Sequence, residues 1–189
     1  MESGPTVFVV DDDQAVRECV RRLVESVHLH AETFSSADEF LKAYNPVCLG
    51  CLVVDVRMPG MSGLELQQRL VDLGYALPVI LLSGYGDVSV AVRAMKAGAV
   101  SFLEKPFNDH LLLDTIREAI EKDAQNRHDL AMAAEIQARI DRLTPREHQV
   151  MDLLVDGNIS KAVAAKLRLS PKTVEVHRAH VMKKLEAKT

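Results

Sequence analysis

Two apolar stretches of this chain end in carboxylates, and this pattern constrains the fold more than any other feature. Residues 51–54 (Cys-Leu-Val-Val) are typical of a strand buried on both faces, and Asp55 follows directly. Residues 7–10 end in the same way, in the consecutive aspartates at 11–13. Ligands bind at the carboxyl ends of strands in open parallel sheets, so we expect these acids to meet at one edge. Repulsion between them predicts a bound cation, and Mg²⁺ suits such oxygen ligands.

Strands and amphipathic helices alternate through the first two thirds of the chain. This alternation predicts an α/β domain with a five-stranded, parallel, doubly wound sheet. The expected strands lie at residues 7–10, 31–34, 51–54, 79–82 and 101–104. The expected helix caps are Asp13, Ser35 or Ser36, Ser62 and Asp87, and a fifth helix follows Asn108.

The residues at the ends of four of these strands have matching chemistry. They are Asp11 with Asp12, Asp55, Ser83 and Lys105. A cation and Lys105 would neutralise the oxygens of a phosphoryl group, and Ser83 would donate a hydrogen bond to one of them. Asp55 would be the in-line nucleophile. The sequence therefore predicts a site that accepts a phosphoryl group.

These residues carry a resemblance to the receiver domain of two-component response regulators over residues 6–122. The matching motifs are Val-Val-Asp-Asp-Asp (9–13), Asp-Val-Arg-Met-Pro-Gly-Met-Ser-Gly (55–63), Ser-Gly (83–84), Met-Lys-Ala-Gly-Ala (95–99) and Glu-Lys-Pro-Phe (104–107). The resemblance implies a flavodoxin-like fold in which Asp55 takes a phosphoryl group from a phosphohistidine of a sensor histidine kinase. It also implies Mg²⁺ held by Asp11, Asp12, Asp55 and the backbone carbonyl of Arg57.

Other expectations follow from the same resemblance. The Lys105–Pro106 bond should be cis, which is consistent with the small trans preference of proline. Phe102 falls at the switch aromatic, which moves into the space vacated when Ser83 turns toward the phosphoryl group. The alternative is that Phe102 is a plain core aromatic. We expect receiver pairing through Val92 and Lys96, and Tyr85 borders the site, where it could restrict water.

The rest of the chain differs in charge. Residues 1–124 carry a net charge of −8 and residues 125–189 a net charge of +4, within a total of −4. This asymmetry indicates two domains with different partners, the basic one meeting nucleic acid. Residues 122–142 contain no Gly or Pro, which predicts a long helix rather than a flexible tether. Their apolar positions keep no sustained heptad, which favours a solvated connector over a coiled coil.

Short helices separated by turns predict a helix-turn-helix near the C-terminal end. Thr144, Pro145 and Glu147 form a helix start with a capping box. Ser160 and Ser170 are the expected caps of the next two helices. The last helix has an inward face of Val174, Val181 and Leu185 and an outward face of Lys172, Glu175, Val176, Ala179 and Lys183. The outward face suits DNA phosphates and base edges, although a basic face can also be simply solvated.

A second resemblance covers residues 143–189. Leu-Thr-Pro-Arg-Glu (143–147), Lys161 with Ala164, Thr-Val-Glu-Val-His-Arg (173–178) and Val-Met-Lys-Lys-Leu (181–185) are similar to the LuxR-type output domain of FixJ/NarL-class regulators. This implies that Glu175, Val176 and Ala179 face bases of promoter DNA, and that Lys161, Lys172, Thr173 and Lys183 face phosphates. Two departures are Ala162, where the pattern often has Glu or Gln, and the end at Thr189, where the family continues into a fourth helix. We expect either a truncated chain or a weakened DNA-bound dimer.

The predicted plan is a receiver at 1–122, a helical linker at 123–142 and a small all-α helix-turn-helix domain at 143–189, apparently lacking its last helix. The predicted function is phosphorylation-dependent regulation of transcription, with a homodimer forming on phosphorylation and no enzymatic activity beyond slow autodephosphorylation. A haloacid dehalogenase-type phosphatase is one alternative, but it needs an acid where this chain has Arg57. A regulator that acts by protein contact without binding DNA is another, and a salt-dependent DNA affinity would separate it from the predicted DNA-binding regulator.

Compartment and redox chemistry are constrained by simpler features. Three cysteines, an odd number, argue against a disulfide framework. Cys48 and Cys51 form a C-x-x-C pair without the second pair that a zinc site needs. No apolar run approaches the roughly 20 residues of a membrane helix. Because no export signal is visible either, we expect a cytoplasmic protein without membrane contact.

Overall fold

The computed structural model describes residues 4–84 and 88–187. The chain divides into two compact units, residues 1–127 and 128–189. Tyr85 and Asp87, which the sequence places beside the site and at a helix cap, lie outside the described residues.

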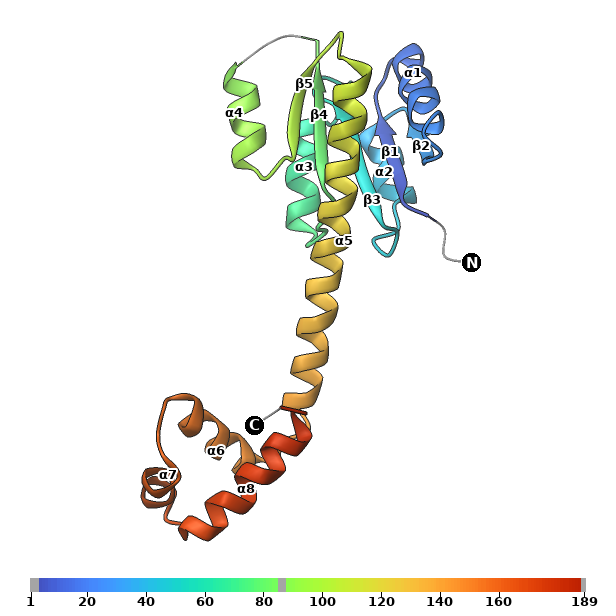
Figure 1. Cartoon of the computed structure of the whole chain (residues 1–189). Coiled ribbons are helices and arrows are strands. Elements are labelled where there is room, and N and C mark those ends of the chain that lie inside the picture. The colour runs from blue at the N-terminus through green and yellow to red at the C-terminus, as the bar shows by residue number, and fades with distance from the viewer. Residues whose placement is uncertain (1–3, 85–87, 188–189) are drawn as a thin grey trace. The chain divides into compact units, whose positions relative to one another are not determined.

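A parallel sheet of five strands forms the centre of the first unit, in the order β2-β1-β3-β4-β5 (Figure 1). The strands are β1 (Thr6–Val10), β2 (His30–Phe34), β3 (Gly50–Asp55), β4 (Val79–Ser83) and β5 (Ser101–Glu104). Strands β1 and β3 are buried throughout, as expected for apolar strands covered on both faces. The predicted five-stranded parallel sheet is confirmed.

Helices cover both faces of this sheet. They are α1 (Gln14–Glu25), α2 (Ala37–Ala43), α3 (Gly63–Asp72), α4 (Val88–Lys96) and α5 (Asp109–Ile140). One core cluster lies beneath α2, α3 and α4 and includes Phe40 and Leu66. The other lies beneath α1 and α5 and includes Val20 and Ile116. Both clusters are therefore needed to bury the two apolar faces of the strands.

Polar side chains cap the first turns of α1, α2 and α3. Asp13 caps α1 by accepting a hydrogen bond from the N–H of Ala15 at 2.8 Å. Ser36, rather than Ser35, caps α2. Ser62 and Glu65 form a full capping box at the start of α3. Of the three consecutive aspartates, Asp13 thus has a structural role at a helix terminus.

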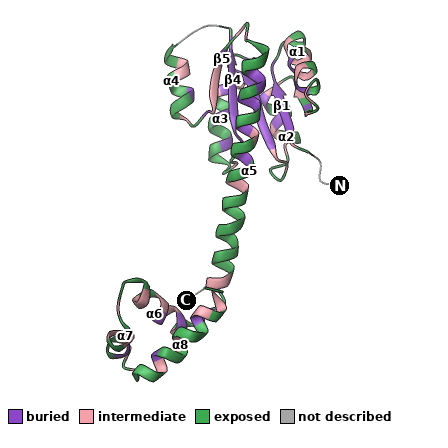
Figure 2. Ribbon diagram, in the orientation of Figure 1, coloured by how far each residue is buried: buried purple, intermediate pink, exposed green. Residues whose placement is uncertain are grey.

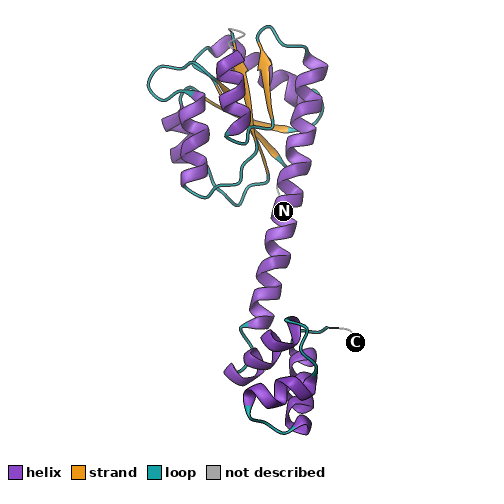
Figure 3. Cartoon of the chain, turned by 90° about the vertical axis from the view of Figure 1, so that its left-hand side faces the viewer, coloured by secondary structure: helices purple, strands orange, loops and turns teal. Residues whose placement is uncertain are grey.

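The second unit is entirely helical in its described part (Figure 3). Its helices are α6 (Pro145–Val155), α7 (Ser160–Leu167) and α8 (Pro171–Lys184), packed around Val150, Val163, Ala164 and Val174. The capping box of Thr144 and Glu147 and the cap at Ser170 are confirmed. The cap predicted at Ser160 was wrong. Ile159 is the cap residue, because its carbonyl already accepts hydrogen bonds from Ala162 and Val163 and so places Ser160 inside the helix.

Helix α5 changes character along its length. Leu112, Ile116, Ala119 and Asp123 are buried, whereas residues 128–138 are exposed (Figure 2). The prediction of a long helix after the receiver is confirmed, and Asp123, assigned to the linker from sequence, packs within the first unit. None of the described helices is long and apolar enough to cross a membrane.

Candidate functional site

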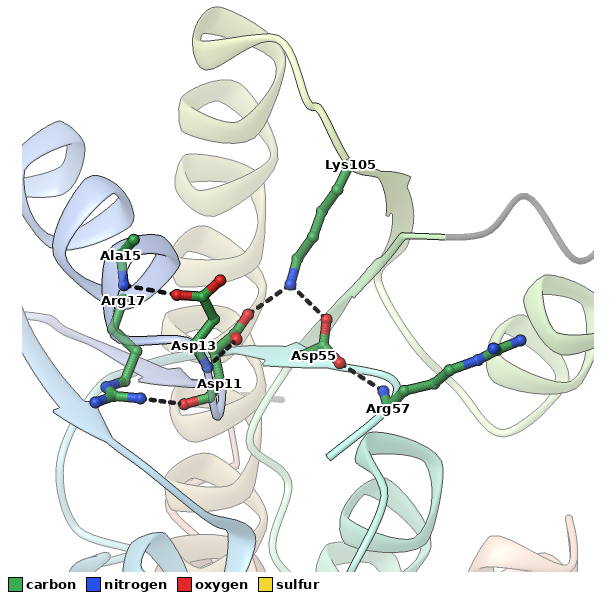
Figure 4. Close-up of polar contacts among 7 residues, drawn as sticks. All are labelled: Asp11, Asp13, Ala15, Arg17, Asp55, Arg57 and Lys105. Carbon is green, nitrogen blue, oxygen red and sulfur yellow. Dashed lines mark hydrogen bonds and ion pairs between the residues drawn. The ribbon is translucent and has the colours of Figure 1, made fainter. Parts of the chain in front are cut away.

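The carboxyl ends of β1, β3 and β5 bring two acids and one amine together (Figure 4). The Lys105 Nζ lies 2.6 Å from Asp11 Oδ2 and 2.5 Å from Asp55 Oδ1. Asp11 and Asp55 are 1% and 6% exposed. Two buried carboxylates thus share a single ammonium, and the three groups together carry a formal charge of −1.

Burial and hydrogen bonding set the protonation of this group. Burial raises the pKa of Asp11, although hydrogen bonds from Lys105 and from the N–H of Asp13 partly oppose the effect. Burial acts to lower the pKa of Lys105, but its hydrogen bonds to Asp11 and Asp55 outweigh burial and raise that pKa. Lys105 is therefore a permanent cation at neutral pH, available to a negatively charged ligand.

The loop after β1 holds Asp11 in position. The N–H of Asp13 donates to Asp11 Oδ1 at 2.9 Å, and Arg17 Nη1 donates to the Asp11 carbonyl oxygen at 2.7 Å. Sequence reasoning missed Arg17, although its place one helical turn after the cap at Asp13 was an available signal. Asp12 is exposed. Across the described part of the chain, no three side chains from His, Cys, Asp and Glu gather as a group able to hold a metal ion.

The residues that do converge still suit a hard cation. Asp11 and Asp55 offer carboxylate oxygens, the ligands that Mg²⁺ prefers, and one ammonium leaves them short of neutral. The turn after β3 orients Asp55, because its Oδ2 accepts the N–H of Arg57 at 2.5 Å. A Cβ at Gly63 would lie 2.3 Å from the Asp55 carbonyl oxygen, so only glycine permits α3 to begin this close to the site.

Ser83 and Phe102 lie on the neighbouring strands. Ser83 is buried at the end of β4, one residue beyond the pairing of Asp55 with Leu82. Its carbonyl oxygen accepts the N–H of Lys105 at 2.7 Å, which ties the ends of β4 and β5 together. Phe102 is partly buried and packs against the cluster beneath α2, α3 and α4. The Lys105–Pro106 bond is cis, as the resemblance implied.

The residues assigned to pairing and to DNA contact are mostly on the surface. Val92 and Lys96 are exposed on α4. On α8, Val174 and Val181 are buried, and the outward face is exposed at Lys172, Glu175, Val176, Ala179 and Lys183. Lys161 is exposed on α7, and Thr173 is half-buried with its hydroxyl oxygen 2.8 Å from Ser170 Oγ. The structure thus separates the two faces of α8 as the helical spacing predicts.

Known families match both units. Residues 7–117 match the response regulator receiver domain, and residues 141–189 match the luxR family of bacterial regulatory proteins. The transcriptional regulatory protein FixJ of Azorhizobium caulinodans is 46% identical over 186 residues, which cover 98% of this chain and 88% of FixJ. The response regulator protein TodT of Pseudomonas putida F1 is 42% identical over 185 residues, covering 98% of this chain and 82% of TodT.

A solved structure agrees with these sequence relatives. The response regulator StyR is 43% identical and superposes with a TM-score of 0.85, covering 98% of this chain and 93% of StyR. The converging acids and lysine, the sheet order and the two family matches all point the same way. The chain belongs to the two-component response regulators that join a receiver domain to a LuxR-type DNA-binding domain, and it is a phosphorylation-dependent regulator of transcription.

Proposed function

We propose that Asp55 is the phosphoacceptor, that a sensor histidine kinase is the donor, and that the acyl phosphate switches the binding of promoter DNA by residues 143–189. The observation that carries this proposal is the position of Lys105 Nζ between Asp11 and Asp55, at 2.6 and 2.5 Å. Because its ammonium already contacts Asp55, Lys105 can donate a hydrogen bond to a phosphoryl group attached to Asp55 without leaving the site.

The transfer uses groups that are already oriented. An oxygen of Asp55 forms the new P–O bond as the P–N bond to the kinase imidazole breaks. Lys105 moves its hydrogen bond from the carboxylate to a phosphoryl oxygen, and the hydroxyl of Ser83 donates to another. Asp11, Asp12, Asp55 and the backbone carbonyl of Arg57 would hold Mg²⁺, and the bound ion would neutralise charge on the phosphoryl oxygens.

The switch involves the neighbouring strand and helix. When Ser83 turns toward the phosphoryl group, Phe102, which is partly buried beside it on β5, moves into the vacated space. Two receivers then pair through Val92 and Lys96, which lie exposed on α4. This pairing brings two copies of the output domain to one DNA site. In this proposal the receiver spans residues 1–122, the linker residues 123–142 and the output domain residues 143–189.

The exposed face of α8 supplies the DNA contacts. Glu175, Val176 and Ala179 read base edges, while Lys161, Lys172, Thr173 and Lys183 contact phosphates. Replacing a phosphate contact, as in Lys172→Ala, lowers affinity for all sequences and reduces the salt slope by about one. Glu175→Gln changes the preferred sequence instead. A chain that acts through protein contact alone would show no salt-dependent DNA affinity.

One position in the sequence argues against phosphatase chemistry. Two residues after Asp55 stands Arg57, where an Asp-nucleophile phosphatase needs an acid to protonate the leaving group. The acyl phosphate therefore decays only slowly by itself, and we infer a phosphoacceptor rather than an enzyme.

A gel shift on DNA fragments selected from a random pool tests this function. The wild type, Asp55→Ala and the exposed-site control Asp38→Ala are compared with and without acetyl phosphate and Mg²⁺. We expect the phosphodonor to tighten binding of the wild type and of Asp38→Ala only. A response that persists in Asp55→Ala, or is absent from the wild type, contradicts the proposal.

A further inference from the structure

A third buried acid lies at the opposite end of the strand that carries Asp55. Asp123 of α5 is 1% exposed, and its Oδ2 accepts two hydrogen bonds. One comes from the backbone N–H of Gly50, the first residue of β3, at 2.9 Å. The other comes from Arg127 Nε, one helical turn further along α5, at 2.8 Å. Residues 73 positions apart in sequence are thereby joined.

Arg127 extends this contact to the loop before β3. Its Nη1 donates to the carbonyl oxygen of Val47 at 3.1 Å, and its Nη2 donates to the carbonyl oxygen of Cys48 at 2.7 Å. All three nitrogens of the guanidinium are therefore engaged, one with Asp123 and two with backbone carbonyls. A planar fork of this kind fixes direction as well as distance.

The backbones of β1 and β3 lie close together at Gly50. A Cβ at Gly50 would lie 1.8 Å from the carbonyl oxygen of Thr6, so no side chain fits at this position. The N–H of Gly50 faces α5, and Asp123 is its acceptor. Asp123 therefore contacts the first residue of the central strand, while Arg127 contacts the loop before it.

We propose that Asp123 and Arg127 form a clamp that couples the receiver to its output. The clamp holds the turns of α5 around residues 123–127 on the start of β3, whose other end carries Asp55. Beyond this point α5 continues to Ile140 with residues 128–138 exposed. This inference rests on the proposed function, because it concerns how a change at Asp55 reaches residues 143–189.

Directional bonds explain why charged groups are used here. Apolar contacts alone allow a helix to slide or rotate by small amounts, whereas a buried carboxylate with fixed donors selects one register. Disturbing the clamp should therefore loosen the register of α5 while the core clusters keep the receiver folded. Phosphorylation chemistry at the far end of β3 should survive this change.

The experiment compares Asp123→Asn, Arg127→Ala and Arg127→Lys with a matched pair on the same helix. Asp114 and Arg117 form an exposed ion pair at 3.2 Å, so Asp114→Asn and Arg117→Ala make the same chemical changes without burial. Three readouts are taken at a temperature where all variants are folded by circular dichroism. They are hydrogen exchange in peptides covering Gly50 and residues 120–127, phosphorylation by acetyl phosphate with Mg²⁺, and the ratio of DNA affinities with and without phosphodonor.

We expect exchange in both peptides to quicken by about tenfold in Asp123→Asn, because the neutral amide oxygen is a weaker acceptor than the carboxylate for the N–H of Gly50 and for Arg127. Asp123→Asn and Arg127→Ala should keep the wild-type rate of phosphorylation but lose most of the phosphorylation-dependent gain in DNA affinity. Arg127→Lys, which keeps the charge but not the planar fork, should give an affinity ratio between that of Arg127→Ala and that of the wild type. The control variants Asp114→Asn and Arg117→Ala should match the wild type.

Two results would overturn the clamp. One is unchanged hydrogen exchange at Gly50 in Asp123→Asn, and the other is a wild-type affinity ratio in folded variants whose exchange has quickened, which reduces the pair to a purely stabilising contact. Failure of the proposed function looks different, because the wild type itself would then show no gain on phosphorylation. Hydrogen exchange would still decide whether the clamp holds α5 on β3.

Discussion

The two ends of β3 place acids beside a cation in opposite ways. At its start, Arg127 directs all three nitrogens to Asp123 and to two carbonyl oxygens, and the carboxylate also accepts the N–H of Gly50. At its end, Asp11 and Asp55 share the single ammonium of Lys105. The first arrangement satisfies its charges, and the second leaves one negative charge unmatched.

This difference separates a structural charge from a functional one. A buried pair whose hydrogen bonds are complete stabilises one arrangement of the backbone. A buried cluster with unmatched charge is less stable than it could be, and either a bound cation or protonation of a carboxyl corrects the imbalance. We infer that the start of β3 is built to hold α5 in one register and that its end is built to receive a cation and a phosphoryl group.

The largest expected effect is on stability at the start of the strand. Asp123→Ala leaves the N–H of Gly50 and the guanidinium of Arg127 without their acceptor, which should lower the free energy of unfolding by about 3 kcal/mol. Urea denaturation followed by circular dichroism measures the change. The matched control Asp114→Ala, in an exposed pair, should lose less than about 1 kcal/mol. Equal losses in the two variants would mean that the buried contacts of Asp123 contribute no more than an exposed ion pair.

The next effect is on chemistry at the other end. Lys105→Ala removes the ammonium that stabilises the charge of the phosphoryl group. Phosphorylation by acetyl phosphate should therefore slow by about 100-fold, the typical effect of removing one charge-stabilising donor. Phosphate-affinity electrophoresis over time gives the rate. Lys42→Ala, at an exposed lysine of α2, should keep the wild-type rate. A fast Lys105→Ala variant would show that the lysine is structural.

A fourth buried acid, Glu147, extends the comparison to the second unit. Hydrogen bonds from Lys184 and from the N–H of Thr144 lower the pKa of Glu147 from 4.5 to about 2. Glu147→Ala should lower the free energy of unfolding by about 2 kcal/mol at neutral pH, because it removes hydrogen bonds to a charged group.

The pH dependence gives the sign of the Glu147 effect. Its folded pKa is depressed, so its contribution is complete above 4.5 and is lost as pH falls toward about 2. The difference between the wild type and Glu147→Ala should therefore shrink across that window in urea denaturation curves. Glu135→Ala, in an exposed pair with Arg139, serves as the control. A gap that stays constant with pH would mean that the charge of Glu147 contributes nothing.

The smallest expected effect is a gain in stability at the functional end. Burial raises the pKa of Asp11, so the folded state favours its protonated form, and its charged form opposes folding at neutral pH. Asp11→Asn should raise the free energy of unfolding by about 1 kcal/mol and abolish the Mg²⁺ dependence of phosphorylation.

The Asp11→Asn gain has its own pH dependence. Protonated Asp11 contributes a relative stability that is complete below pH 3.8 and is lost as pH rises through the raised pKa. The gain in stability from Asp11→Asn should therefore appear only above that raised pKa. Urea denaturation at both pH extremes, with Asp38→Asn as control, measures it. A loss of stability at neutral pH would place Asp11 with the structural acids.

Local sequence predicted the site better than the clamp. The strands could be predicted because each is a short apolar run that ends abruptly in a polar residue, and parallel strands carry those ends to one edge. Asp123 could not, because a charged residue in an unbroken helical pattern reads as solvated unless its partner is known. That partner is a backbone N–H 73 residues away. Burial of this kind is a tertiary property that no local pattern contains.

Smaller differences have equally local causes. Ser160 lost its predicted role as a cap because the helix starts one residue earlier, at a boundary that side-chain preference does not fix. Asp12 remains exposed while Asp11, its neighbour, is buried, since consecutive residues at the end of a strand point to opposite sides. Arg17 reaches the Asp11 carbonyl only because the cap at Asp13 sets where α1 begins.

Mapping the phosphoryl group tests the central claim most directly. The full chain is incubated with acetyl phosphate and Mg²⁺, the acyl phosphate is reduced with borohydride to an alcohol that marks the residue, and peptides are sequenced by mass spectrometry. The account predicts the mark on Asp55 and its near absence in Lys105→Ala. A mark on Asp11, Asp12 or another acid, or none on a folded chain, would contradict it.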